Sequence, residues 1–530
     1  MHATVKKQGS KLDVKISEMS CDGLTLPWIS PETWLAYLVQ KGLWPKLAGV
    51  ESGGYAMARE VWTEFWRKFK IINEDHELWS LDLDLSRAAA FMVHGDEGRT
   101  LKKGGLMVTS LQSVLGHGWD NKRVQKLYRD GVPRLSLNFA GHSFTTRFVS
   151  SALPKTVYES NPKVFYDAMG HLAKSLRRVL VQGYVDPSSG ERYHIVIIGA
   201  KGDQPYLNKL AGFYRSFNTT AKRGDERAVP KGVCPYCCAG MVGFPAEDLG
   251  TACPVWLPTV GVKLPWLRTP ALIEELPHNR GNPAAYFHSD IWHIVHLGIG
   301  KSWAASVVQM ALPALPLRNL EEKWEFLTSH YRRWCRAHHR QPHVTKITPV
   351  LMSYGDYSGA VGAWSKGALT HSLLAWLVDL LGEVPQGNDG LLQVCREGSY
   401  RMNAMFSTLF RADAFLTGQL SSFVSEQGLC FLRLYSDLAR KQFEAGRQWL
   451  FPLYPKLHIF HHLMLRVLQQ GRSFGFATNP LMHSCQMDED TVGRVSRISR
   501  RVNIRKVASR SLSRYLIQAH TAFSDAGWLA

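Results

Sequence analysis

The pattern of hydrophobic and polar positions changes character several times along the chain. Between residues 88 and 150 the apolar runs are short and separated by turn residues, which is typical of strands. A segment with apolar residues at helical spacing follows, and a fourth strand-like run comes after it. The predicted strands are residues 88–94, 105–112, 134–149 and 193–198, with Gly199 ending the last one, and the predicted helix is 162–182.

The rest of the chain divides into parts of different pattern. With 530 residues it is too long for one ordinary core, so several units are expected. We predict a mainly helical N-terminal region, a first part of an α/β core, a Cys/Pro/Gly-rich irregular segment, a large helical insertion, and a C-terminal core helix with a basic tail. The boundaries are residues 1–87, 88–231, 232–288, 289–472 and 473–530.

The order of elements in residues 88–231 is β-β-β-α-β, which is the order of the ribonuclease H-like core. We therefore expect an α/β protein of this class, interrupted by the cysteine-containing segment and by the helical insertion. In such a fold the first and fourth strands lie side by side, so residues at their ends become neighbours.

Charge and composition narrow the class of partner. Lys and Arg number 63 against 44 Asp and Glu, and the net charge of +19 favours a polyanion such as nucleic acid. A basic surface that serves solubility is the alternative. No apolar run approaches the ~18 residues of a membrane span. Nine unevenly spaced cysteines indicate a reducing compartment rather than a disulfide framework, and a DNA substrate would place the protein in the nucleus.

Two carboxylates stand at predicted strand ends. Asp96 follows the first strand within Gly95-Asp96-Glu97-Gly98, and Asp203 follows the fourth within Lys201-Gly202-Asp203. Phosphodiester chemistry uses two Mg²⁺ (or Mn²⁺) ions about 4 Å apart, held by a few carboxylates. The alternative is ordinary turn chemistry, because Gly-Asp often marks a loop.

A third acid is expected from the last helical segment, residues 489–519. Asp488, Glu489 and Asp490 stand near its start. We choose Glu489, because it would project inward together with Val492 and Val495. Asp488 and Asp490 are possible substitutes, and pairing of all three acids with the helix dipole is the alternative.

A cysteine pair indicates a second metal. Cys234-x-x-Cys237 is the first half of a structural zinc site, and a redox pair or buried free thiols are the alternatives. The candidates for the other half are Cys253, His278, His288 and His293. Asp290 and His293 share a helical face and could bind metal, or Asp290 could orient the imidazole.

The C-terminal segment is basic and free of acids from residue 491 to 523. Arg494, Arg497 and Arg501 fall on one helical face, and Arg505 follows. Such a stripe can track DNA phosphates, although a solvated helix face is the alternative.

These residues resemble a known group, the eukaryotic cut-and-paste transposases with a ribonuclease H-like DDE/DDD domain, over about residues 88–515. Asp96 and Asp203 stand where that family has its first two acids, and Glu489 follows a helical insertion as the family's last acid does. Cys234, Cys237 and the Asp290–His293 pair match its Cys-x-x-Cys and (Cys/Asp)-x-x-His signatures, and the pattern looks closest to the Plavaka/KDZ-like, CxC-containing members. A departure is that residues 1–85 contain Cys21 alone and no recognisable zinc finger.

The resemblance implies a metal-dependent enzyme that cuts double-stranded DNA at element ends and joins the freed 3′-hydroxyl to target DNA. Asp96, Asp203 and Glu489 would hold Mg²⁺ or Mn²⁺, Cys234 and Cys237 would bind Zn²⁺, and the arginines would hold DNA. A homo-oligomer is an open question, and no membrane is implied. The rivals are a domesticated DNA-binding protein without catalysis and a ribonuclease H-like nuclease.

Overall fold

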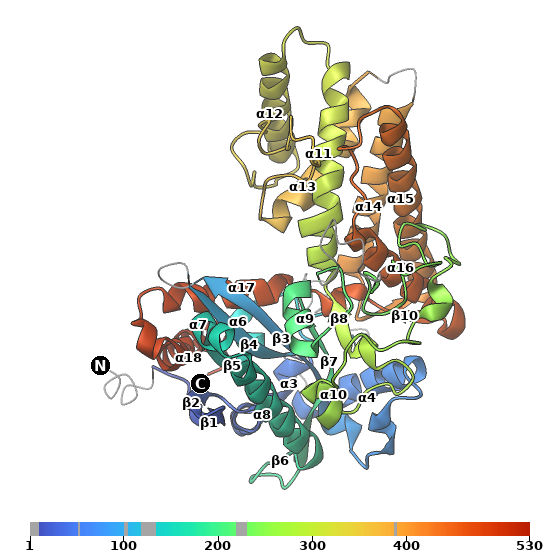
Figure 1. The fold of residues 1–530 in the computed structure, drawn as a ribbon. Coiled ribbons are helices and arrows are strands. Elements are labelled where there is room, and N and C mark those ends of the chain that lie inside the picture. The colour runs from blue at the N-terminus through green and yellow to red at the C-terminus, as the bar shows by residue number, and fades with distance from the viewer. Residues whose placement is uncertain are drawn as a thin grey trace.

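The computed structural model describes residues 10–50, 54–99, 104–117, 134–218, 231–385 and 390–529. It is a mixed α/β structure, mostly helical, built on a mixed central sheet (Figure 1). The strands of this sheet are β1 (Ser17–Cys21), β2 (Leu24–Trp28), β3 (Ala88–Arg99), β4 (Gly105–Ser113), β5 (Arg147–Pro154), β6 (Tyr184–Val185), β7 (Arg192–Gly202) and β8 (Phe287–Ser289).

The strand order is β1-β2-β5-β4-β3-β7-β6, and β8 also pairs with β7. Strands β3, β4 and β5 form an antiparallel meander. The chain then crosses through helix α8 (Pro162–Val181) and returns as β7, which lies parallel to β3. The first and fourth strands of the predicted β-β-β-α-β unit are therefore neighbours, and β8 extends the parallel part.

The N-terminal region is less helical than its pattern predicts, because it begins with a hairpin. Strands β1 and β2 pair around Asp22-Gly23, whose φ angles of 45° and 79° are typical of a tight hairpin turn. Strand β2 joins the main sheet at β5. Helices α2 (Pro31–Gln40), α3 (Trp44–Leu47) and α4 (Gly54–Ile72) follow.

Three predicted strand limits are wrong. The first strand, β3, does not end at His94 but continues through Asp96 to Arg99. The third strand is β5, and residues 143–146 before it form the short helix α6 (Ser143–Thr146). Strand β7 does not end at Gly199 but runs on to Gly202. The pairing with β3 shifts register between Phe91 and Met92, so a bulge accommodates this stretch of β7. A side chain at 199 would meet the ring of His288 on β8 at 2.4 Å, which explains the glycine.

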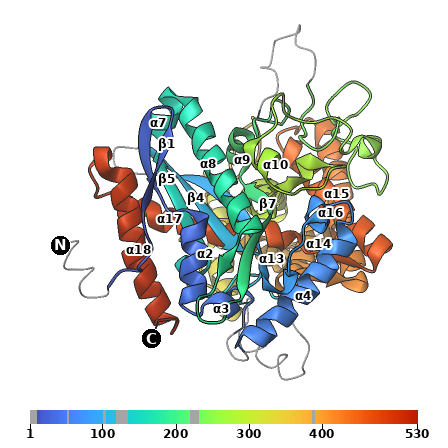
Figure 2. The ribbon, with the colours of Figure 1, turned by 90° about the horizontal axis from the view of Figure 1, so that it is seen from below.

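Helices cover the sheet and extend away from it. Helix α8 packs on β7 and β1, and α2 packs on α8. Helices α17 (Gln486–Ser499) and α18 (Val507–Asp525) stand where one helical segment was predicted, with a break between them. Helix α17 packs on β3, whereas α18 packs on β5 and β2, toward the other end of the sheet from β7 (Figure 2). Short helices α7 (Lys155–Ser160), α9 (Gln204–Ala211) and α10 (Ala271–Glu275) complete this part.

A layer of long helices stands to one side of the sheet (Figure 1). Successive members α13, α14, α15 and α16 pack on one another, and α11 packs on α13. Strands β9 (Phe415–Thr417) and β10 (Phe476–Thr478) form a small second sheet at its base. The helices are α11 (Gly300–Ala311), α12 (Leu320–Ala337), α13 (Gly367–Glu383), α14 (Leu391–Arg411), α15 (Gly418–Glu444) and α16 (Pro455–Phe474).

Candidate active site and metal centre

Two of the predicted acids lie where the parallel pairing of β3 with β7 ends. The parallel register pairs His94 with Lys201, so Asp96 and Asp203, each two residues further on, reach the same level of the sheet. Asp96 lies within β3, and Asp203 is the N-cap of α9, where its Oδ1 accepts a hydrogen bond from the Tyr206 N–H at 2.8 Å. One carboxylate is thus fixed by a strand and the other by a helix start.

Glycines beside these acids allow close packing. A Cβ at Gly95 would lie 2.2 Å from the ring of Tyr206, and one at Gly202 would lie 2.5 Å from the same ring. A Cβ at Gly98 would lie 2.8 Å from Cβ of Ser496 on α17. The glycines therefore bring α9 and α17 close to the strand ends that carry the acids.

Helix α17 supplies the third acid. The carboxyls of Glu489 and Asp96 lie within hydrogen-bonding distance of each other. Asp490 instead forms an ion pair with Arg494 at 2.6 Å and accepts a hydrogen bond from Ser143 at 2.7 Å. Of the three adjacent acids, Glu489 is the one that joins Asp96 and Asp203.

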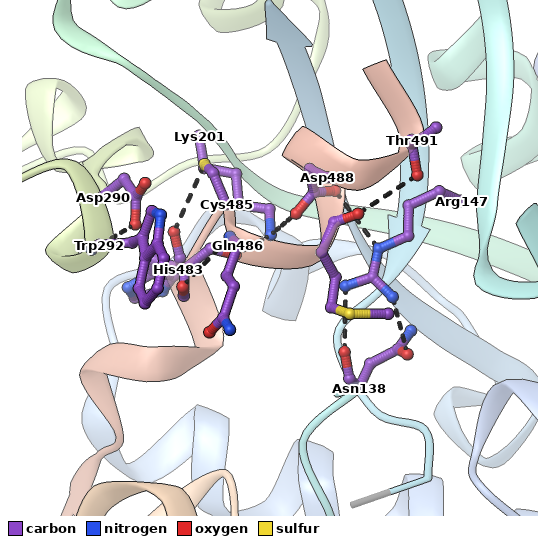
Figure 3. Close-up of polar contacts among 12 residues, drawn as sticks. Asn138, Arg147, Lys201, Asp290, Trp292, His483, Cys485, Gln486, Asp488 and Thr491 are labelled. Atoms are coloured by element: carbon purple, nitrogen blue, oxygen red, sulfur yellow. Dashed lines mark hydrogen bonds and ion pairs between the residues drawn. The ribbon is translucent and has the colours of Figure 1, made fainter. Parts of the chain in front are cut away.

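Asp488 has a structural role, because its buried carboxylate lies between the cationic side chains of Lys201 and Arg147 (Figure 3). Nζ of Lys201 donates to its Oδ2 at 2.7 Å, and Nε of Arg147 lies 3.5 Å from Oδ1. The side chains of Asp488 and Lys201 are 0% exposed, and that of Arg147 is 1% exposed. Burial alone would raise the pKa of Asp488, but the charges of Lys201 and Arg147 outweigh it and lower that pKa. Asp488 thus anchors α17 to β5 and β7 and is not a free metal ligand.

The grouped acids repel one another. Burial raises the pKa of Asp96. Burial and then the charge of Asp96 raise the pKa of Asp203, and the same two causes raise the pKa of Glu489 to about 8. At neutral pH a protonated Glu489 can therefore donate to Asp96. Hard carboxylate oxygens that are crowded in this way form a donor set suited to Mg²⁺ or Mn²⁺, whose charge would favour their ionised forms.

The Asp290–His293 pair also belongs to this group of acids. Nδ1 of His293 donates to Oδ2 of Asp290 at 2.6 Å, while its Nε2 lies 3.6 Å from Oε1 of Glu489. Burial alone would lower the pKa of His293, but Asp290, Glu489 and Asp203 outweigh it and raise this pKa to about 9. The imidazole thus carries a proton and a positive charge beside Glu489, and Asp290 orients it.

A cavity of about 280 Å³ opens beside these residues. Its lining comes from the end of β7, from β8, from the kinked helical segment Trp292–Ile299 and from α16. Polar lining residues include Asp203, Gln204, Asn218, Ser289, His293 and Lys456. The carboxylate of Asp203 is therefore accessible from a concave surface.

A buried Cys/His cluster that could hold a metal such as zinc takes two of its members from α16. Cys234, Cys237, His458 and His462 each offer a ligand atom, and these atoms all lie within 4.8 Å of one another. Nε2 of His458 is 3.3 Å from Sγ of Cys237, and Nε2 of His462 is 3.5 Å from Sγ of Cys234. Two thiols and two imidazoles are the donor set of a closed tetrahedral zinc site. Without a cation, burial and then Cys234 raise the pKa of Cys237 far above its usual range.

The predicted second half of this cluster is wrong. His293 lies with the acids, His288 stacks on His483 with ring centres 3.7 Å apart, His278 hydrogen-bonds to Leu276, and Cys253 is exposed. The missed residues are His458 and His462. They are four apart on α16 and so share a face, which is a spacing that binds metal in other helices and was visible in the sequence.

Helix α16 connects the two centres. Lys456, which precedes the two histidines, donates from Nζ to the carbonyl oxygens of His293 and Leu297 at 2.8 and 3.3 Å. The Leu297 carbonyl lies where the Trp292–Ile299 segment loses helical geometry, at Leu297 and Gly298, and His293 precedes this break by four residues. The lysine therefore holds the kinked backbone that presents His293, and the cysteine cluster fixes the helix that carries the lysine.

The four arginines that were predicted to form one basic stripe have different surroundings in the structure. Arg494, Arg497, Arg501 and Arg514 line one surface hollow between α17 and α18. Arg494 is paired with Asp490, whereas Arg497 and Arg501 are exposed, and the described residues give neither an acidic partner within 4 Å. Arg505 lies beyond the end of α17 in the turn Ile504–Lys506 and does not line the hollow.

No protein-family model matches this chain, and no curated protein matches it at a significant level. Within the described ranges, none of the helices is both long and apolar enough to span a lipid bilayer.

Proposed function

We propose that this protein is a transposase-like enzyme that cleaves DNA and transfers strands, with a ribonuclease H-like core. Three features support the fold assignment: the antiparallel meander β3-β4-β5, the crossover through α8, and the return of β7 beside and parallel to β3. The observation that carries the functional proposal is that Asp203 and Glu489, which are far from Asp96 in the sequence, both lie close to it where the pairing of β3 with β7 ends.

Asp96, Asp203 and Glu489 would hold two Mg²⁺ or Mn²⁺ ions. When bound, such a metal pair neutralises charge on the phosphate and activates a water or a 3′-hydroxyl. The chain's own residues prepare the site. Glu489 gives up its proton when the cations bind, and His293 keeps a positive charge at Nε2 beside Oε1 of Glu489. Asp290 fixes the orientation of that imidazole.

The other features fit a DNA substrate. Zn²⁺ in the cluster of Cys234, Cys237, His458 and His462 would fix α16. The exposed arginines Arg497 and Arg501, supported by a net charge of +19, would contact phosphates of double-stranded DNA at element ends and at the target. Because its substrate would be double-stranded DNA, the protein would act in the nucleus.

The test is DNA nicking by the zinc-loaded protein with Mg²⁺ or Mn²⁺. We expect wild-type protein to nick DNA only with the divalent ion, and Asp203→Asn to lose this activity. Asp82→Asn, which changes an exposed acid away from the site, should behave as wild type. Joining of a 3′-hydroxyl end to a second DNA distinguishes a transposase from a nuclease. Normal DNA binding without cutting in either metal would refute the enzyme and leave a DNA-binding protein.

A further inference from the structure

A second cavity, of about 360 Å³, lies next to the cysteine cluster and is separate from the acids. It is bounded by α4, by the segment before β8, by α16 and by the turn Pro480–His483. None of Asp96, Asp203, Asp290, His293 and Glu489 lines it. Its polar lining includes Arg466, His288, His483, Tyr286, Asn282 and Gln469, and the lining contains no Asp or Glu.

Arg466 is the charged group of this cavity. It lies one turn after His462 on α16, and the described part of the chain offers it neither an ion pair within 4 Å nor a side-chain hydrogen bond. Burial lowers the pKa of its guanidinium, and the Tyr236 hydroxyl is what opposes this. An unpaired, half-buried guanidinium that lines a cavity without Asp or Glu makes this cavity favourable for an anion.

Other donors surround the same space. His288 and His483 stack face to face with ring planes 7° apart. Burial lowers the pKa of both, so each ring is neutral at pH 7 and has one N–H; for His288 the backbone carbonyl of Ile198 is a competing acceptor. Tyr286 is 5% exposed, and the described residues give its hydroxyl no hydrogen-bond partner. A guanidinium fork, imidazole N–H groups and a free hydroxyl suit the several oxygens of a phosphate group.

We propose that this cavity binds a phosphate group, held by Arg466 with the His288–His483 pair and Tyr286. The group comes either from a free phosphate in solution or from the backbone of bound DNA. Both sources present the same tetrahedral oxyanion to the same donors. The site is distinct from the acids that would hold divalent cations, so it does not depend on the proposed cleavage activity.

The experiment measures phosphate binding by the zinc-loaded full chain. Inorganic phosphate is titrated calorimetrically into wild type, Arg466→Gln, Tyr286→Phe and the control Arg472→Gln, which changes an exposed arginine further along the same helix. We expect Arg466→Gln to weaken binding by about tenfold or more, because it removes hydrogen bonds from a charged donor. Tyr286→Phe should weaken it by roughly twofold to tenfold, and Arg472→Gln should match wild type.

Folding and the source of the phosphate are checked in the same variants. Zinc content and circular dichroism identify a misfolded Arg466→Gln protein, and Tyr286→Phe, which removes one oxygen atom, then decides the matter. If DNA binding also weakens in Arg466→Gln, and if the log–log salt slope of this binding falls by roughly the amount of one phosphate contact, the phosphate belongs to DNA. If DNA binding is unchanged, the phosphate is free. Equal phosphate binding by wild type, Arg466→Gln and Tyr286→Phe, or no binding by wild type above a chloride control, overturns the proposal.

Discussion

Asp488 and Glu489 are adjacent on α17, yet the structure predicts different changes in stability when each carboxyl is replaced by an amide. Asp488→Asn removes the charge between Lys201 and Arg147, whose side chains are 0% and 1% exposed, and leaves two buried cations without a carboxylate. Removing one partner of a buried ion pair costs about 3–5 kcal/mol. Since a typical domain is stable by only ~5–15 kcal/mol, this loss is a large share of the total.

Glu489→Gln is the matched control. The Glu489 carboxyl faces Asp96 and has its pKa raised to about 8, first by burial and then by the charge of Asp96. At pH 7 this carboxyl is already mostly protonated and Gln reproduces its neutral form, so stability without metal should be nearly unchanged. The free energy of unfolding is measured by urea denaturation at pH 7 without divalent cations, followed by tryptophan fluorescence and circular dichroism.

A double variant tests whether the unpaired buried cation causes the loss of stability in Asp488→Asn. Lys201→Met together with Asp488→Asn should cost less than the sum of the two single changes, by about 0.5–3 kcal/mol, because the buried cation is removed with its partner. The reasoning fails if Asp488→Asn unfolds at the wild-type urea concentration. It also fails if Glu489→Gln is the more destabilised of the two adjacent variants.

Other predictions concern pH, zinc and DNA. The raised pKa of Glu489 means that the metal-free folded state keeps a proton that the unfolded chain loses above about pH 4.5. The contribution of Glu489 to stability should therefore fall as pH rises from about 4.5 to 8, so the difference in melting temperature between wild type and Glu489→Gln should change over this range. Mn²⁺ affinity, measured by calorimetry, should rise over the upper part of the range. A difference in melting temperature that does not change with pH would contradict this reasoning. Cys237→Ser should lose bound zinc, measured by metal analysis. It should also lose metal-dependent nicking, because α16 would no longer hold the kink at Leu297 through Lys456. Full nicking by the zinc-free protein would refute this coupling. The double change Arg497→Ala with Arg501→Ala should weaken DNA binding and lower its log–log salt slope by roughly 0.9 per lost contact. Arg494→Ala should have less effect because Asp490 already neutralises that arginine, and equal slopes in all variants would contradict phosphate contact.

Local patterns predicted the elements that bring the acids together. The apolar runs before Asp96 and Asp203 and the stripe of α8 are short-range signals, and they place the two carboxylates on β3 and after β7. The Asp22-Gly23 hairpin was equally visible as a turn signal and was missed. The continuation of β7 through Gly199 was not predictable, since it depends on the bulge opposite β3 and on the ring of His288 from a distant strand.

Long-range pairing explains what the sequence could not provide. Cys234 and His462 are 228 residues apart, and nothing in the cysteine-containing segment indicates that its partners come from α16. The choice of Glu489 over Asp488 rested on inward projection, but Asp488 is the more buried of the two, with 0% of its side chain exposed against 33% for Glu489. What separates them is the identity of the neighbours: Lys201 and Arg147 surround Asp488, whereas Asp96 faces Glu489. Such neighbours follow from tertiary packing and not from helical spacing.

The most direct test of the account is a count of Mn²⁺ ions at the acids by electron paramagnetic resonance, on zinc-loaded protein at pH 8. We predict two bound Mn²⁺ ions per chain with a spin-coupled signal in wild type, and loss of that signal in Asp203→Asn and in Glu489→Gln. Asp82→Asn should keep it. Wild-type protein that binds no Mn²⁺ pair, or variants that bind it as wild type does, would contradict the claim that these carboxylates form a two-metal site.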